Sequence, residues 1–212
     1  MSRLLSRALP AVVPLVLLAA VVPASHAERA VTEDAVGDVQ SMTLDLDSDE
    51  EQGFVPAPDE TSVDITRTVV THGVRRLEVT VHLRDLVTSR YTSTFVRVFT
   101  PNAKYDLELT KVPGSRAEVA FSSKRREACR GVRGRLDGAA DTVTLALPTA
   151  CVGSPRWVRG GVGAIAFDPG LAEALAEDGD WDGSTITMFA DDGHRGTIRD
   201  TSIGKGPKVR RG

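Results

Sequence analysis

The sequence has few aromatic residues, few cysteines and no familiar catalytic motif. Phe, Trp and Tyr make up 5% of its 212 residues, and only two of these residues are tryptophans. It contains no G-x-S-x-G, no H-E-x-x-H and no glycine-rich phosphate loop, which excludes the best-known hydrolase, zinc-protease and nucleotide-binding signatures. A formal net charge of -3 excludes a strongly basic nucleic-acid-binding protein, and 26% charged residues exclude a protein of many membrane spans.

The first 27 residues have the pattern of a secretory signal peptide. Two arginines precede an apolar run that two prolines interrupt, and the small residues Ser25 and Ala27 predict cleavage before Glu28. An uncleaved membrane anchor is the alternative, but the run is shorter than the roughly 20 residues that span a bilayer. We therefore expect a secreted protein with no membrane segment after cleavage, a folded domain over 28–203 and a disordered tail over 204–212.

Cys129 and Cys151 are the only cysteines of the chain. In an oxidising compartment the economical interpretation is one structural disulfide between them, which would stabilise the fold by about 3 kcal/mol through loop closure. A reactive thiol or a metal-binding pair is the alternative. No histidine lies near either cysteine in the sequence to activate it or to share a metal.

The middle of the chain alternates between apolar and polar residues, as half-buried strands do. Leu77, Val79, Val81 and Leu83 are each separated by one polar residue. Further strands are predicted over 63–71, 95–100, 104–110, 118–122, 143–147, 157–167 and 185–190. Turn signals separate them, and one short helix is predicted over 171–177. This pattern predicts an all-β protein, an antiparallel β-sandwich of jelly-roll or immunoglobulin-like type with one short helix.

Charge is distributed unevenly along the chain. Residues 28–64 include 12 acidic and one basic residue, whereas residues 65–160 include 17 basic and 8 acidic residues. One interpretation is that the acidic stretch lies across the basic one and neutralises it. The other is that the acidic stretch binds cations while a basic strand face meets an anionic partner, the face being formed by Arg67, Arg76, Arg84 and Arg97.

Two acidic segments are candidate calcium sites. Asp178, Asp180 and Asp182 alternate in a glycine-containing loop after the predicted helix, and alternate carboxylates in a tight loop can point at one hard cation. Further ligands would come from elsewhere, with Asp191 and Asp192 as candidates. The alternative is an acidic turn in which Gly179 caps the helix.

The second candidate lies near the predicted mature N-terminus. Gly37 would let the backbone turn so that Asp34 and Asp38 converge on one calcium ion. The acidic residues over 45–51 that follow have few apolar neighbours, and a flexible loop is the simpler interpretation for them.

The histidines and tryptophans offer weaker signals. His72, His82 and His194 are each expected at the surface, in a turn or on the polar face of a strand. Trp181, in a loop, is a candidate ligand contact or a lid over the core. Trp157, in a glycine-rich strand, is expected in the core, although the two together would also suit a sugar-stacking platform.

Four segments resemble a group of uncharacterised secreted proteins from high-GC actinobacteria. They are Asp34-Ala35-Val36-Gly37-Asp38-Val39, Asp64-Ile65-Thr66-Arg67, Val81-His82-Leu83-Arg84-Asp85-Leu86 and Cys151-Val152-Gly153-Ser154-Pro155-Arg156-Trp157-Val158-Arg159. More remotely, an acidic opening followed by a hairpin is similar to DOMON-like and family-9-type carbohydrate-binding sandwiches. The resemblance implies a β-sandwich over nearly all of 28–200, and the remote one implies carbohydrate binding.

These observations favour a secreted, non-catalytic binding module, stabilised by calcium, that binds cell-wall glycan or an exported protein and does not bind nucleic acid. Two other classes stay open. One is a hydrolase that uses paired carboxylates, because that chemistry needs only two acids a few ångströms apart. The other is a secreted inhibitor or structural interaction protein.

Overall fold

The computed structural model describes residues 27–45, 53–124, 128–167, 185–196, 198–199 and 202–212. These residues form strands and one short 3-10 turn, η1 (Thr149–Val152). The strands are β1 (Glu28–Glu33), β2 (Gln40–Asp45), β3 (Val55–Pro56), β4 (Ile65–His72), β5 (Arg76–Leu83), β6 (Thr92–Phe99), β7 (Lys104–Lys111), β8 (Glu118–Ser122), β9 (Arg133–Asp137), β10 (Thr142–Pro148), β11 (Trp157–Phe167), β12 (Thr185–Asp192) and β13 (Val209–Arg210).

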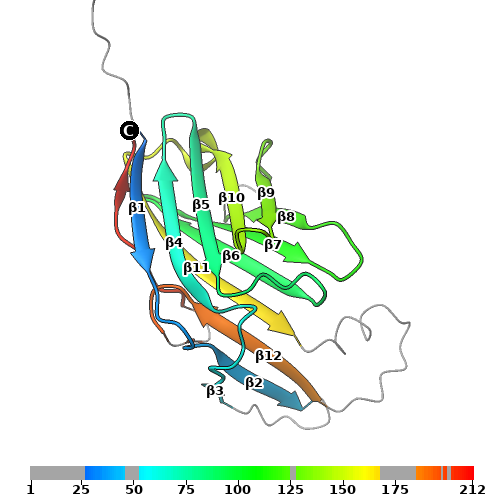
Figure 1. The fold of residues 1–212 in the computed structure, drawn as a ribbon. Coiled ribbons are helices and arrows are strands. Elements are labelled where there is room, and N and C mark those ends of the chain that lie inside the picture. The colour runs from blue at the N-terminus through cyan, green and yellow to red at the C-terminus, as the bar shows by residue number, and fades with distance from the viewer. Residues whose placement is uncertain (1–26, 46–52, 125–127, 168–184, 197, 200–201) are drawn as a thin grey trace, which may run out of the picture.

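The strands form two antiparallel sheets (Figure 1). The smaller sheet has the order β1-β4-β5-β10-β9. The larger has the order β3-β2-β12-β11-β6-β7-β8, and β13 pairs with β11 beside this path. Buried apolar side chains from both sheets belong to one hydrophobic cluster, so the sheets pack face to face. The predicted all-β sandwich is confirmed, whereas the helix predicted over 171–177 lies outside the described residues.

The apolar residues that alternate in the sequence are buried in the core, as predicted. Leu77 and Val79 of β5, and Leu145 and Leu147 of β10, are each at most 1% exposed. Burying one such side chain contributes about 1.5–3 kcal/mol. Across the sandwich they share the cluster with Leu107 and residues of β6 and β11. Among the described residues, no helix is long and apolar enough to cross a membrane.

The predicted disulfide between Cys129 and Cys151 is present, with the two Cα atoms 5.9 Å apart. It connects the segment that leads into β9 with η1, which follows β10. β9 and β10 are neighbours in the smaller sheet. The disulfide therefore joins the segment before the edge strand β9 to the segment after its neighbour β10.

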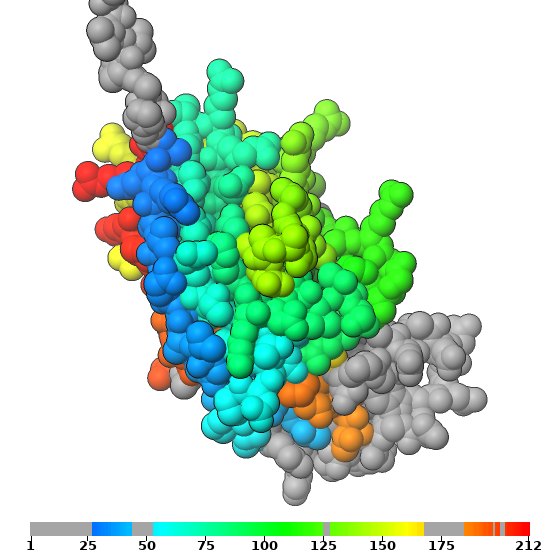
Figure 2. Space-filling model, in the orientation of Figure 1, coloured from blue at the N-terminus to red at the C-terminus, as the bar shows by residue number. Residues whose placement is uncertain are grey.

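The C-terminal residues 204–212 are part of the fold, which corrects the prediction of a disordered tail. Val209 is 0% exposed and pairs with Val158 of β11. The Gly206 N–H donates to the Gly160 carbonyl oxygen at 2.8 Å. One apolar side chain and a row of backbone hydrogen bonds are enough to hold the segment, which the low apolar content of this stretch did not reveal. Figure 2 shows the end of the chain at the surface beside β1.

Glycine in β11 is required by this packing. A Cβ atom added to Gly161 would lie 2.5 Å from the Gly204 carbonyl oxygen and 2.8 Å from the Ile203 Cγ2 atom. Glycines in a strand are typical of close approach by another backbone, and here the C-terminal segment is that backbone.

We expect Gly161→Ala to destabilise the protein by about 1–3 kcal/mol, because the C-terminal backbone must move away from β11. Urea unfolding of the variant measures the loss. Gly138→Ala is the matched control, since a Cβ atom there meets nothing within 4 Å. Equal midpoints for the two variants would contradict the packing argument.

Candidate metal centre

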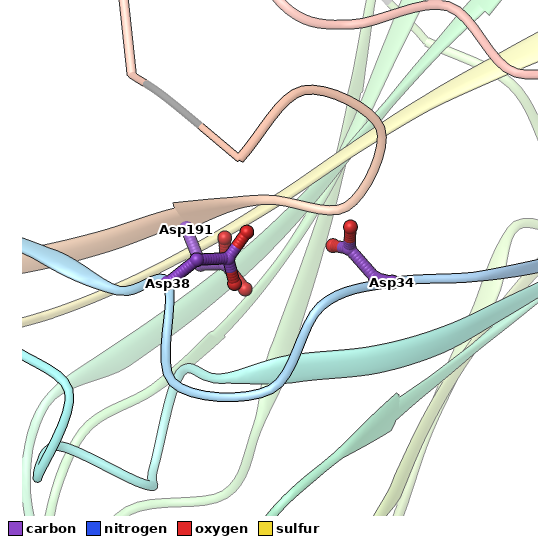
Figure 3. Close-up of side chains that lie close together, drawn as sticks. All are labelled: Asp34, Asp38 and Asp191. Atoms are coloured by element: carbon purple, nitrogen blue, oxygen red, sulfur yellow. The ribbon is translucent and has the colours of Figure 1, made fainter.

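Three aspartates meet where β1 leads into β2 and where β12 ends (Figure 3). Asp34 follows β1, Asp38 lies just before β2, and Asp191 belongs to β12. Each of the three contributes one carboxylate oxygen to a group in which all the oxygens lie within 4.8 Å of one another. We call these three residues the acidic centre.

The loop that holds Asp34 and Asp38 is fixed by hydrogen bonds from two of its backbone N–H groups. The Asp34 N–H donates to the Thr66 carbonyl oxygen at 3.0 Å. Gly37 has a φ of 81°, in the left-handed region that glycine adopts without steric cost, and its N–H donates to Asp64 Oδ2 at 2.9 Å. The turn at Gly37 expected from the sequence is therefore present, and it brings Asp34 and Asp38 to one place.

Asp191 reaches the centre from β12 of the larger sheet. Its side chain is almost fully buried, with 1% of the residue exposed. The Ile65 N–H donates to Asp191 Oδ2 at 2.7 Å, which connects β12 of the larger sheet with β4 of the smaller one. The other oxygen, Oδ1, is buried and has no hydrogen-bond partner.

Two more buried aspartates support the acidic centre. Asp64 is 0% exposed, accepts the Gly37 N–H, and has Arg84 Nη1 3.4 Å from its Oδ2. Asp192 accepts the Gly204 N–H at 2.7 Å and the His194 N–H at 3.1 Å. Asp64 thus orders the loop of Asp38, whereas Asp192 anchors the C-terminal segment.

The acidic centre lacks compensating charge. Four of its carboxylate oxygens are buried without a hydrogen-bond partner, namely Asp34 Oδ2, Asp38 Oδ1, Asp38 Oδ2 and Asp191 Oδ1. In the part of the chain that the structure describes, no lysine or arginine forms an ion pair with any of the three residues. Burying such oxygens unpaired is costly, so the centre must take up protons or a cation.

The pKa values of the acidic centre are raised for the same reason. Burial raises the pKa of Asp191 to about 8, against the effect of the Ile65 N–H, and the charges of Asp38 and Asp34 raise it further. Burial, followed by the charge of Asp38, raises the pKa of Asp34 to about 7. Burial also raises the pKa of Asp38. Without a metal ion the centre therefore retains protons near neutral pH, and a divalent cation would displace them.

The donor set fits a hard cation. All the free ligand atoms are carboxylate oxygens, and calcium takes six to eight oxygen ligands in irregular geometry. Waters or backbone carbonyl oxygens would complete that number. Zinc and copper prefer nitrogen and sulfur ligands, and the group contains no histidine or cysteine.

The sequence identified only part of this centre. It singled out Asp34 and Asp38, but it considered Asp191 and Asp192 only as extra ligands for the loop over 178–183. That loop, with Asp178, Asp180, Trp181 and Asp182, lies outside the described residues. One signal in the sequence could have revealed Asp191. Asp191 and Asp192 directly follow Phe189 and Ala190 at the end of a strand, where carboxylates can be buried with the strand.

The histidines are less exposed than the sequence suggested. His72 was expected in a solvated turn, but it is the last residue of β4, is 0% exposed and has Nδ1 3.2 Å from the Val209 carbonyl oxygen. His194 is half-buried with neither ring nitrogen hydrogen-bonded. Burial lowers the pKa of both side chains. His72 was misjudged because the C-terminal residues, distant in sequence, cover it.

The basic strand face expected from the sequence is not formed. Arg67 and Arg76 belong to the smaller sheet, and Arg84 follows it and contacts Asp64. Arg97 lies on β6 of the larger sheet, with its Nε atom 2.6 Å from Asp106 Oδ1. The sequence could not assign these strands to sheets, because strands adjacent in sequence can belong to different layers.

The molecule so described is an all-β sandwich with one disulfide and a buried acidic centre between the ends of its sheets. The sequence matches no protein-family model, and neither curated proteins nor solved structures gave a significant match. Its function is therefore inferred from the centre and the surface.

Proposed function

We propose that this chain is a secreted, non-catalytic binding module whose β-sandwich is stabilised by calcium bound to Asp34, Asp38 and Asp191. The observation that carries the proposal is the buried Asp191 carboxylate, which has a free oxygen, two neighbouring carboxylates and no cationic partner. The signal-like leader and the disulfide support secretion. Extracellular calcium sites typically have dissociation constants near the millimolar range, so this site needs only a moderate affinity for calcium.

Calcium at this position would connect three parts of the fold. Asp34 and Asp38 belong to the loop between β1 and β2, and Asp191 belongs to β12 and is hydrogen-bonded to the start of β4. An ion held by all three would therefore tie the smaller sheet to the larger one. Ligand binding to the folded state alone adds about 2.7 kcal/mol when the ligand is at a hundred times its dissociation constant.

A binding module is favoured over the carboxylate-dependent hydrolase. A hydrolase of that kind needs both carboxyl groups in contact with its substrate. Asp191 is 1% exposed and both carboxylate oxygens of Asp38 are buried, so a sugar or peptide would not touch them. The raised pKa values have a simpler cause in burial and mutual repulsion. A ligand for the module is expected among cell-wall glycans or exported proteins.

Thermal unfolding at neutral pH tests the calcium site. We expect the midpoint to rise by several degrees when millimolar calcium replaces chelator, because the ion binds only the folded state. Magnesium at the same concentration should give a smaller shift, since it demands a regular octahedral site. Titration calorimetry should give about one calcium ion per chain at this centre.

A pair of variants separates this centre from the rest of the acidic surface. Asp38→Asn removes charge from the acidic centre and should lower the calcium affinity at least tenfold. Asp85→Asn is the control, since Asp85 is exposed and lies outside the centre. A wild-type protein that neither binds calcium nor melts at a higher temperature in its presence would overturn the proposal.

A further inference from the structure

Cations gather at the end of the larger sheet, around the turn between β6 and β7. The strand register places Phe99 of β6 opposite Arg159 of β11 on one side and opposite Lys104 of β7 on the other. The C-terminal segment adds Lys205 and Lys208, both exposed. Since that segment is packed against β11, its lysines belong to the same surface.

Aromatic rings hold three of these ammonium groups in place. The Nζ atoms of Lys104 and Lys205 lie 5.8 Å and 4.8 Å from the centre of the Phe99 ring. The Nζ atom of Lys208 lies 4.6 Å from the centre of the half-exposed Trp157 ring. Such contacts restrict long side chains before any ligand arrives, which lowers the entropy lost on binding.

The cations line a shallow, open hollow. A hollow of about 580 Å³ is lined by Phe99, Lys104, Trp157, Arg159 and Lys205 together with the turn over 100–103. We call it the cationic hollow. It contains three cations and no carboxylate, although the chain as a whole carries a net charge of -3.

These cations have no acidic partner of their own. In the described ranges, none of Lys104, Arg159, Lys205 and Lys208 has a carboxylate within ion-pair distance. Asp106, on the same strand as Lys104, is already paired with Arg97. Positive charge concentrated in a hollow attracts anions and raises their local concentration.

The lining favours a polar ligand over a peptide with apolar anchors. The turn contributes Thr100 and Asn102, which offer hydroxyl and amide groups. The large apolar side chains that are exposed among the described residues lie elsewhere: Val31, Val36, Val55, Val74 and Val112. Protein interfaces normally centre on apolar anchors, whereas the aromatic rings of this surface, Phe99 and Trp157, have lysine ammonium groups over them.

We propose that the cationic hollow binds a polyanionic glycan, a sugar polymer that carries carboxylate, sulfate or phosphate groups. Lys104, Arg159 and Lys205 contact the anionic groups, and Thr100 and Asn102 contact the sugar hydroxyls. This inference rests on the proposed binding function and names its ligand class. It does not rest on calcium, because the hollow shares no residue with the acidic centre.

Binding to immobilised dextran sulfate, with neutral dextran as the reference polymer, tests the proposal. The calcium-loaded protein should bind dextran sulfate and not dextran, and added salt should weaken the binding by screening. The triple variant K104Q/R159Q/K205Q should bind dextran sulfate at least roughly tenfold more weakly than the wild type. The control R116Q/R130Q/R133Q makes the same change in net charge at exposed arginines elsewhere and should stay within about twofold.

The outcomes separate the alternatives. Equal losses in the two triple variants would show that only bulk charge matters and would overturn the site. Binding of polyglutamate as tightly as alginate, a carboxylated glycan, would overturn the glycan specificity and favour an acidic protein partner. Because the thermal response to calcium is measured separately, a wild-type protein that responds to calcium but does not bind dextran sulfate would contradict only the cationic hollow. If the triple variant folds poorly, the single variant K205Q replaces it in the test. Lys205 is exposed, and this variant should lose part of its glycan binding.

Discussion

In chelator at slightly alkaline pH, Asp191→Asn should unfold at a higher temperature than the wild-type protein. Ionising Asp191 inside the folded protein is unfavourable, since burial raises its pKa to about 8 from the ordinary value of 3.8. One pKa unit corresponds to about 1.4 kcal/mol, so removing this charge should stabilise the protein by a few kcal/mol. Asparagine keeps the shape of the side chain and an oxygen that accepts the Ile65 N–H.

Calcium should reverse the advantage of the variant. The wild-type midpoint should rise by several degrees in millimolar calcium, whereas that of Asp191→Asn should change by roughly a degree or less, because the variant lacks a charged ligand. Differential scanning calorimetry with and without chelator measures both effects, with Asp85→Asn as the control that should follow the wild type. A variant that is less stable than the wild type in chelator would show that the Asp191 charge is already compensated within the protein.

The stability of the metal-free protein should fall as the pH rises from about 6.5 to about 8. Asp34 and Asp191 have pKa values raised to about 7 and about 8, so the folded state holds protons in this range that the unfolded state has lost. Each such proton contributes about 1.4 kcal/mol per pH unit, and we expect a slope on the order of 1 kcal/mol per pH unit. The charges that face these two groups are those of Asp38, Asp64 and Asp192, all of the same sign.

Histidine titration sets the lower limit of this window. Burial lowers the pKa values of His72, His82 and His194 below 6.5, so their protonation in the unfolded state reduces stability as the pH falls under that value. Below it the aspartate and histidine effects oppose each other, whereas above it the histidine effect fades and the aspartate effect dominates.

Urea unfolding across this window, in chelator and in calcium, gives both slopes. With calcium the decline should disappear, because the ion binds the ionised carboxylates and competes with protons. Asp191→Asn should show a smaller decline in chelator than the wild type. A flat wild-type profile in chelator would mean that the acidic centre is ionised throughout.

Most strands in the middle of each sheet were predictable, β2 of the larger sheet being the exception, and several edge strands were not. β5 and β10 bury one face fully, so their apolar residues alternate and the sequence reveals them. β1 and β9 lie at the two edges of the smaller sheet and are mostly exposed. An edge strand needs hydrogen bonds from one neighbour only, and it has no strict apolar pattern to read.

The sequence by itself determined the local features of this protein. Alternating residues defined the central strands, and two cysteines allowed only one intramolecular disulfide. A glycine placed between Asp34 and Asp38 predicted their turn toward each other. The strands and the turn follow from residues close in sequence, and the disulfide follows from the presence of only two cysteines.

Only the tertiary structure decided which distant residues complete the sites. Asp191 joins Asp34 and Asp38 because β12 ends beside the start of β4, a contact between segments 126 residues apart. Lys205 reaches Phe99 because the C-terminal segment packs on the glycines of β11. The acidic centre depends on the relative position of the two sheets, and the cationic hollow depends on the packing of the C-terminal segment on the larger sheet. Burial and long-range hydrogen bonds fix both arrangements, which local sequence preferences do not encode.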